Sequence, residues 1–282
     1  MVDDSGLDAP QTYPFLKGHG TENDFVLLLD AEGTIHADLS ADRVRALCDR
    51  RAGIGGDGVL RVIHTAVIAP ELAERAEWFM DHRNADGSVA QMCGNGLRVF
   101  ARYLLEAGRV DPDRPIPVAT RDGIKVVTRD GDDLVADMGT PATVAGSTVS
   151  ANGFTWPTVG VDMGNPHAVA FVDDLAQAGS LIEAPTHDPA VYPDGVNVEF
   201  VVRKGDAHLA MRVYERGSGE TRSCGTGACA VMVAAATADG RGPGSVYLVD
   251  VPGGRLRLTW REDGHVLLAG PAVLVGSGVT GL

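Results

Sequence analysis

The feature that most constrains this chain is an internal repeat, each half of which ends on a cysteine followed by Gly-x-Gly. The first half contains, in order, "GTENDFV" (20–26), "GDGV" (56–59), "NADGS" (84–88) and "MCGNG" (92–96). The second half contains "MGNPHAV" (163–169), "PDGVNVEF" (193–200), "YERGSGETR" (214–222) and "SCGTG" (223–227). Four matches in the same order predict two halves of similar fold. A pseudo-twofold relation between them would bring both cysteines to one cleft.

Each of the two cysteines is followed by a predicted helix. Apolar residues recur at helical spacing from Leu97 onward, and Gly108 would end that helix. Residues 228–236 are apolar nearly all round, which is typical of a helix buried on every side, and Gly240 would end it. A third helix is expected over 41–51 with Ser40 as its N-cap, and a short one over 69–76.

Most of the remaining chain is predicted to form short strands between Gly, Pro and Asp turns. The expected strands cover 25–29, 59–63, 77–80, 125–128, 134–138, 168–172, 196–202, 209–214, 246–251, 255–260 and 265–268. Strands far outnumber helices, so the fold class is expected to be α+β rather than a doubly wound sheet.

Composition excludes several classes of protein. The net charge of −14 argues against a nucleic-acid partner, because binding phosphates needs a basic face. No apolar run approaches the roughly 20 residues that span a bilayer, and the acidic segment 1–12, expected to be an unstructured lead-in, lacks the apolar core of a signal peptide. Four cysteines without an export signal predict a reducing, cytoplasmic setting.

Two patterns that resemble known binding motifs are rejected, one because of the elements around it and the other because of its spacing. Gly53, Gly55 and Gly58 spell G-x-G-x-x-G, but a helical pattern precedes them and a strand follows, the reverse of a dinucleotide site. Cys224 and Cys229 are five residues apart, which places them roughly 140° apart around a helix and on different faces. The sequence therefore predicts no metal site, and it predicts Cys229 and Cys48 as core residues.

Cys93 and Cys224 differ from the other two cysteines because each opens a helix. The free N–H groups and positive dipole end of a helix start favour anions. The pKa of each thiol is therefore expected to fall. The same helix starts could hold a carboxylate of a ligand through the backbone N–H groups of Gly94, Asn95, Gly225 and Thr226.

Polar residues in predicted turns surround the two cysteines. They are Asn23, Asn84, Asn165, His167, Asn197, Glu215 and Arg216. Asparagines are common in turns for local reasons alone, and that alternative stays open for each. An adjacent Glu and Arg, however, could bind the ammonium and the carboxylate of one amino-acid centre.

Two thiols that face one cleft from mirrored halves suit a two-base isomerisation. One thiolate removes a proton from carbon, and the opposite thiol delivers a proton to the other face. His167 and Glu215 are expected to lie beside one thiol each and to set the two protonation states. No feature predicts a cofactor, although three lysines (Lys17, Lys125 and Lys204) leave a Schiff base open.

At these residues the chain resembles the diaminopimelate epimerases. The segments "GTENDF", "NADGS", "MCGNGLR", "MGNPH", "GVNVEF" and "YERGSGETRSCGTGACA" match that family's motifs between residues 15 and 268. The resemblance implies two pseudo-symmetric domains, each a curled, mostly antiparallel sheet around a central helix. It implies a homodimer without a cofactor that interconverts L,L- and meso-2,6-diaminopimelate for lysine and peptidoglycan synthesis.

The resemblance also implies roles for single residues. Cys93 and Cys224 match the catalytic pair, and His167 and Glu215 match residues that tune their pKa values. The substrate contacts implied are Asn23, Asn84, Gly94, Asn95, Asn165, Asn197, Glu215, Arg216, Gly225 and Thr226. The expected domains are 1–130, completed by 272–282, and 131–271.

One position departs from the family pattern, and two other functions remain open. Many members carry Gln where this chain has Gly58, so a side-chain contact is expected to be missing there. A related racemase acting on proline or hydroxyproline is the nearest alternative, although Glu215 and Arg216 would then have no charged centre to bind. The other alternative is a redox protein that uses the two cysteines as a switchable disulfide.

Overall fold

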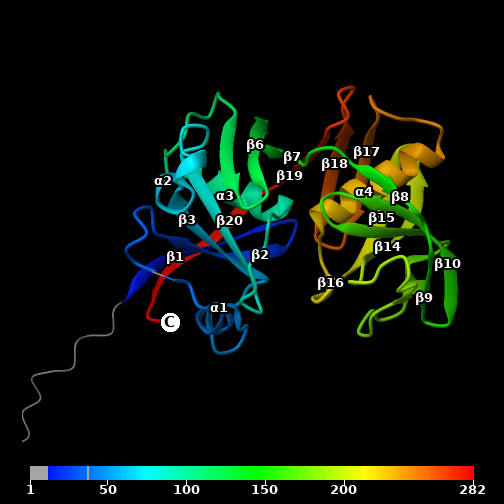
Figure 1. The fold of residues 1–282 in the computed structure, drawn as a ribbon, viewed down its shortest axis with the longest axis horizontal. Helices are drawn as coiled ribbons and strands as arrows, with labels where there is room; N and C mark the ends of the chain where they lie inside the picture. The colour runs from blue at the N-terminus through cyan, green and yellow to red at the C-terminus, as the bar shows by residue number, and fades with distance from the viewer. Residues whose placement is uncertain (1–11, 37) are drawn as a thin grey trace, which may run out of the picture.

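The computed structural model describes residues 12–36 and 38–282, and these form two lobes that lie side by side (Figure 1). The helices are α1 (Ala41–Cys48), α2 (Thr65–Ile68), α3 (Gly94–Glu106) and α4 (Gly225–Ala238), with 3₁₀ turns η1 (Pro70–Leu72) and η2 (Leu175–Ala178). The strands are β1 (Tyr13–Gly20), β2 (Asn23–Leu29), β3 (Gly58–His64), β4 (Trp78–Asn84), β5 (Ile116–Thr120), β6 (Gly123–Asp130), β7 (Asp133–Asp137), β8 (Ala142–Val144), β9 (Thr148–Ala151), β10 (Phe154–Pro157), β11 (Val159–Asp162), β12 (Pro166–Phe171), β13 (Thr186–His187), β14 (Asn197–Gly205), β15 (His208–Glu215), β16 (Gly219–Thr221), β17 (Val246–Val251), β18 (Gly254–Trp260), β19 (Val266–Gly270) and β20 (Val273–Thr280). All but Thr12 of the expected lead-in over 1–12 lies outside the described residues.

The strand pairings repeat between the two lobes. In the first lobe β2 runs parallel to β3, β3 antiparallel to β4, β4 parallel to β5, and β5, β6 and β7 are antiparallel neighbours. In the second lobe β12, β14, β15, β17, β18 and β19 pair in the same succession and with the same directions. The predicted repeat and the α+β class, with mostly antiparallel strands, are therefore confirmed.

Two pairings tie distant parts of the chain together. β19 pairs with β7, so that Leu267 lies opposite Asp137. β20 pairs with β1 and returns the end of the chain to the first lobe, where the red strand crosses beside β1 (Figure 1).

A helix occupies the centre of each lobe. All residues of α4 from Gly227 to Ala236 are buried, as the apolar sequence predicts. α3 buries the face that begins at Leu97, and Gly108 follows it with a positive φ of 61°. Cys48 and Cys229 are buried at 5% and 0% exposure, which confirms both as core residues.

Several expected boundaries differ from those observed. Ser40 caps α1 as predicted, but the helix ends at Cys48 because the chain then turns back so closely that a Cβ on Gly53 would meet the carbonyl oxygen of Ala46. The helix expected over 69–76 is wrong. Pro70 opens only one 3₁₀ turn there, because Pro lacks the N–H that a continuing helix from 65–68 would need.

Candidate active site

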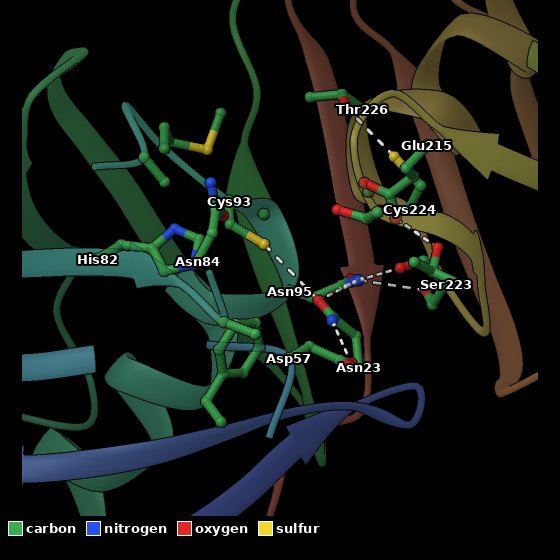
Figure 2. A pocket seen from close by; sticks show the side chains of 18 of the residues that line it. Asn23, Asp57, His82, Asn84, Cys93, Asn95, Glu215, Ser223, Cys224 and Thr226 are labelled. Carbon is green, nitrogen blue, oxygen red and sulfur yellow. Dashed lines mark hydrogen bonds between the residues drawn. The ribbon is translucent and has the colours of Figure 1, made fainter. Parts of the chain in front are cut away.

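One cleft of about 1180 Å³ lies between the two lobes and gathers most of the predicted site residues. Those that line it are Asn23, Asn84, Cys93, Gly94, Asn95, Asn165, Glu215, Arg216, Cys224, Gly225 and Thr226. Figure 2 shows the two cysteines approaching the cleft from opposite lobes. The lining residues include no lysine within the described part of the chain, so the structure brings no Schiff-base candidate to this cleft.

The starts of α3 and α4 meet at the bottom of the cleft. A Cβ placed on Gly225 would lie 3.5 Å from Cα of Gly94 and 3.6 Å from the backbone nitrogen of Asn95. The missing side chains thus let two helix N-termini come together. Two sets of first-turn N–H groups, which have no acceptor within their own helix, converge on one place.

Each catalytic candidate is the N-cap of its helix. Sγ of Cys93 accepts a hydrogen bond from the N–H of Gly96 at 3.4 Å, and Sγ of Cys224 accepts one from the N–H of Gly227 at 3.3 Å. The identical geometry follows from the repeated Cys-Gly-x-Gly. It fixes both sulfur atoms at the mouths of the helices.

The surroundings of the two thiols differ. The Cys93 thiol donates toward Oδ1 of Asn23 at 3.7 Å. Cys224 instead has the carboxyl of Glu215 close enough to raise its pKa, and it lies 3.5 Å from the hydroxyl of Thr226. One thiol therefore has a neutral amide partner, and the other has a carboxyl group that can exchange a proton with it.

The expectation that the helix starts lower both thiol pKa values is wrong. Burial raises the pKa of Cys93 to about 11, although the N–H of Gly96 acts in the opposite direction. Burial also raises the pKa of Cys224 far above its usual value, and the carboxyls of Glu215 and Glu199 add to the effect. Removing the thiolate from water outweighs the helix terminus here, so thiolate must form through a neighbouring base.

Glu215 is suited to that exchange. Part of its surface faces the cleft, but protein packs around the carboxyl, and this desolvation raises the pKa of Glu215. Its Oε1 accepts a short hydrogen bond from the hydroxyl of Thr221. A carboxyl with a raised pKa is closer to the thiol in proton affinity than an exposed one.

Asn95 joins the two lobes through its side chain. Its Nδ2 lies 3.2 Å from Oδ1 of Asn23, 3.0 Å from the carbonyl oxygen of Ser223 and 3.2 Å from Oγ of Ser223. Its Oδ1 accepts from Nη2 of the fully buried Arg98 at 3.0 Å. The side chain is therefore fully engaged by protein, and only the backbone N–H of Asn95 is left for a ligand.

His167 and Asn197 lie behind the cleft wall rather than in it. The Nδ1 of His167 lies 2.6 Å from Oε1 of Glu199, and its Nε2 lies 3.0 Å from Oδ1 of Asn165. Asn197 donates to the carbonyl oxygen of Pro166 and accepts from the N–H of Arg216. The hydrogen bonds of His167 thus go to Glu199 and Asn165 rather than to a thiol, contrary to expectation.

Comparison with known proteins assigns the chain to one family. A model of the family described as diaminopimelate epimerase matches residues 15–144 and 159–275. The chain belongs to the diaminopimelate epimerase family.

Relatives in this family are similar over nearly the whole chain. The diaminopimelate epimerase of Streptomyces coelicolor is 58% identical over 276 residues, which cover 94% of each chain. That of Corynebacterium glutamicum is 44% identical over 275 residues, which cover 95% of this chain and 98% of the relative. The resemblance seen in the motifs is therefore confirmed.

Solved structures share the fold at low identity. A phenazine biosynthesis protein of the PhzF family from Bacillus anthracis superposes with a TM-score of 0.72 at 16% identity, covering 96% of this chain and 99% of that one. A hydroxyproline epimerase from Agrobacterium vitis gives 0.65 at 18%, covering 97% and 94%. At such identities the likeness concerns the fold alone.

Sequence reasoning missed several residues that build the site of this epimerase-family chain. Glu199 is wholly buried, and its Oε1 would lie only 2.8 Å from a Cβ on Gly227, so the carboxyl packs directly against the start of α4. A single acid inside the apolar run "VNVEFVV" was the available signal. Asp57 accepts a hydrogen bond from Asn23 through its Oδ2 at 2.8 Å. Its position in "GDGV", an ordinary turn sequence, gave no sign of this contact.

Proposed function

We propose that this protein interconverts L,L- and meso-2,6-diaminopimelate by a two-base mechanism without a cofactor. One observation carries the proposal. Two thiols cap two helix N-termini that abut at the bottom of a single cleft between pseudo-symmetric lobes. Such a pair can address both faces of one carbon atom, which a single base cannot do without moving.

The different partners of the two thiols support a division of labour. In one direction Glu215 takes the proton of Cys224, and the resulting thiolate removes the α-proton of the substrate. Cys93, a neutral thiol beside Asn23, delivers its proton to the opposite face. The roles reverse for the other stereoisomer, as microscopic reversibility requires.

The helix starts are proposed to stabilise the carbanion. The backbone N–H groups of Gly94, Asn95, Gly225 and Thr226 would hold the carboxylate of the reacting centre, where negative charge builds up. The backbone dipoles would thus stabilise the negative charge of the carbanion, as a cofactor does in other racemases. The desolvation that raises both thiol pKa values also strengthens these interactions.

The distal amino-acid centre is proposed to bind at the polar rim. Arg216 is exposed in the cleft, and its Nη1 donates to the carbonyl oxygen of Asp194 at 2.8 Å, which leaves the rest of its guanidinium fork for a carboxylate. Glu215, Asn84 and Asn165 line the same rim. His167 and Asn197 support it from behind, since they bind Asn165 and the N–H of Arg216.

The proposal is tested by exchange of the α-hydrogen in deuterated water. Reduced enzyme should exchange the α-hydrogen of L,L-diaminopimelate and form the meso isomer. A proline or hydroxyproline racemase would instead exchange the α-hydrogen of those amino acids. Exchange of proline without exchange of diaminopimelate would reject the assignment.

The domain boundaries, location and assembly are part of the same proposal. Domains 1–130 with 272–282, and 131–271, are supported by the pairing of β20 with β1. Four unpaired cysteines support a reducing, cytoplasmic setting. No helix in the described ranges is long and apolar enough to cross a membrane.

A homodimer is supported by one edge of the first lobe. β20 pairs with β1 along one side, and its Val275 and Val279 are 57% and 67% exposed. Exposed valines on an edge strand favour association with another copy. Light scattering at micromolar concentration should give twice the mass of the chain, and Val279→Lys should reduce it.

A further inference from the structure

His82 lies in the cleft wall and has no part in the mechanism described so far. It precedes Asn84 by two residues on β4, so both side chains face the same side of the sheet. Figure 2 shows the imidazole next to Asn84 on the same side of the cleft as Cys93. Only 5% of His82 is exposed, and the residue belongs to the cleft lining.

The ring of His82 is neutral and carries a single proton. Burial lowers the pKa of His82 to about 4. Its Nδ1 is buried and finds no hydrogen-bond partner among residues 12–36 and 38–282. Because an orphaned buried N–H is rarer in proteins than an under-satisfied acceptor, the proton belongs on Nε2.

The backbone beside His82 is shaped to accommodate the ring. A Cβ on Gly58 would lie 3.1 Å from Nε2 of His82 and 2.6 Å from the carbonyl oxygen of Arg83. The carbonyl oxygen of Arg83 and the imidazole of His82 together take the space into which a side chain at position 58 would extend. This explains why the chain has glycine there, and it puts a polar nitrogen at the spot where a side-chain contact was expected to be missing.

The pseudo-symmetry of the lobes relates the position of Gly58 to that of Asn197 in the second lobe. Phe25 pairs with Gly58 in the first lobe, and His167 pairs with Asn197 at the same place in the second. The second lobe thus has a histidine and an amide where the first has only a phenyl ring and a glycine. His82, edge-on to Phe25 with 5.6 Å between ring centroids, supplies the polar group from the next strand.

We propose that His82 contacts the substrate and donates a hydrogen bond from Nε2 to one of its carboxylate oxygens. The proposal rests on the proposed function. The acceptors of 2,6-diaminopimelate are its two carboxylates, since its ammonium groups only donate, and a neutral Nε2–H can only donate. His82 therefore gives the first lobe a side-chain contact that orients the substrate beside Cys93.

Kinetics of two variants test the proposal. His82→Leu should raise KM for L,L-diaminopimelate roughly tenfold to a hundredfold, the range expected for a hydrogen bond to a charged group, with kcat within about threefold. His82→Gln, whose amide can donate, should recover part of that loss. An unchanged KM in His82→Leu would overturn the proposal.

His36 offers a matched control within the same chain. It is 1% exposed, neither ring nitrogen finds a partner in the described part of the chain, and burial lowers its pKa to about 4 as well. It does not line the cleft. His36→Leu should leave KM unchanged, so that a shift common to both variants would assign His82 a merely structural role and overturn the proposal.

A second measurement does not depend on a histidine variant that folds. In the Cys93→Ala protein the ¹⁵N resonance of His82 Nε2 should shift when L,L-diaminopimelate saturates the cleft, and that of His36 should not. Saturation without a shift at His82 would overturn the proposal. The exchange assay on the wild type distinguishes failure of the proposed function from failure of the role of His82. An inactive wild type refutes the proposed function. An active wild type together with an unchanged KM in His82→Leu refutes only the role of His82.

Discussion

Replacing Asn95 by alanine tests how much its side chain stabilises the fold around the helix starts, including its bond to Ser223 of the second lobe. Its Nδ2 has two hydrogens for three nearby oxygen atoms, so it contributes two neutral hydrogen bonds at a time, to Asn23 and Ser223. Its Oδ1 adds a third, charge-assisted bond from Arg98. At about 1 kcal/mol for each neutral bond and about 1.5–3 kcal/mol for the charged one, the free energy of unfolding should fall by about 3.5–5 kcal/mol.

The assay is urea denaturation at pH 7, which gives the free energy of unfolding of the wild type and of Asn95→Ala. Asn84→Ala is the matched control, because the side chain of Asn84 donates one exposed bond to Ser88. The control should lose less than about 1 kcal/mol of stability but should raise KM, since Asn84 is a proposed substrate contact. Equal stability losses in the two variants would refute the prediction that Asn95 stabilises the fold through these hydrogen bonds.

Further predictions concern the two thiols and the buried acid Glu199. Cys93→Ala and Cys224→Ala should each abolish epimerisation under reducing conditions. Full activity in either variant would exclude the two-base mechanism. If the cysteines formed only a redox switch, neither substitution would abolish activity under reducing conditions. Mild oxidation should inactivate the enzyme by linking the two cysteines, reversibly by thiol, which peptide mapping can check. Because burial raises the pKa of Cys93 to about 11, its alkylation rate should climb steadily from pH 7 to 10, and a plateau below pH 8 would contradict this. The same shift implies a contribution to stability that is complete below about pH 9, the ordinary thiol pKa, and is lost as pH rises through about 11. Glu199→Gln should lower kcat at least tenfold, because it replaces the carboxyl that is hydrogen-bonded to His167; an unchanged kcat would assign Glu199 to packing alone.

The parts that sequence predicted best are those governed by local patterns. Apolar periodicity predicted α3 and α4, and every strand expected from the pattern overlaps an observed one. Short or glycine-rich strands were missed, such as β8, whose three residues are all exposed, and β20, which glycine interrupts. Such strands form because a neighbouring strand offers a partner, and that neighbour is distant in the sequence.

The thiol chemistry shows the limit of local reasoning. The helix start is visible in "CGNG" and "CGTG", and with it the direction of the dipole. Burial is a property of the assembled lobes, and it reverses the expected change in the pKa of Cys93 and Cys224. The same holds for Asn95, whose backbone was predicted to face a ligand but whose side chain proved to join the lobes.

The sequence by itself determined the two halves, the cysteine at the mouth of each central helix, and the family. It could do so because each repeated motif, each helical periodicity and each glycine turn can be recognised within a short stretch of the sequence. Only the tertiary structure decided which residues meet within each lobe around the cleft: Glu215 with Cys224 and Glu199 with His167 in the second lobe, and His82 over Gly58 in the first. These contacts depend on strand register and on the pairing of segments far apart in the chain, which no local pattern encodes.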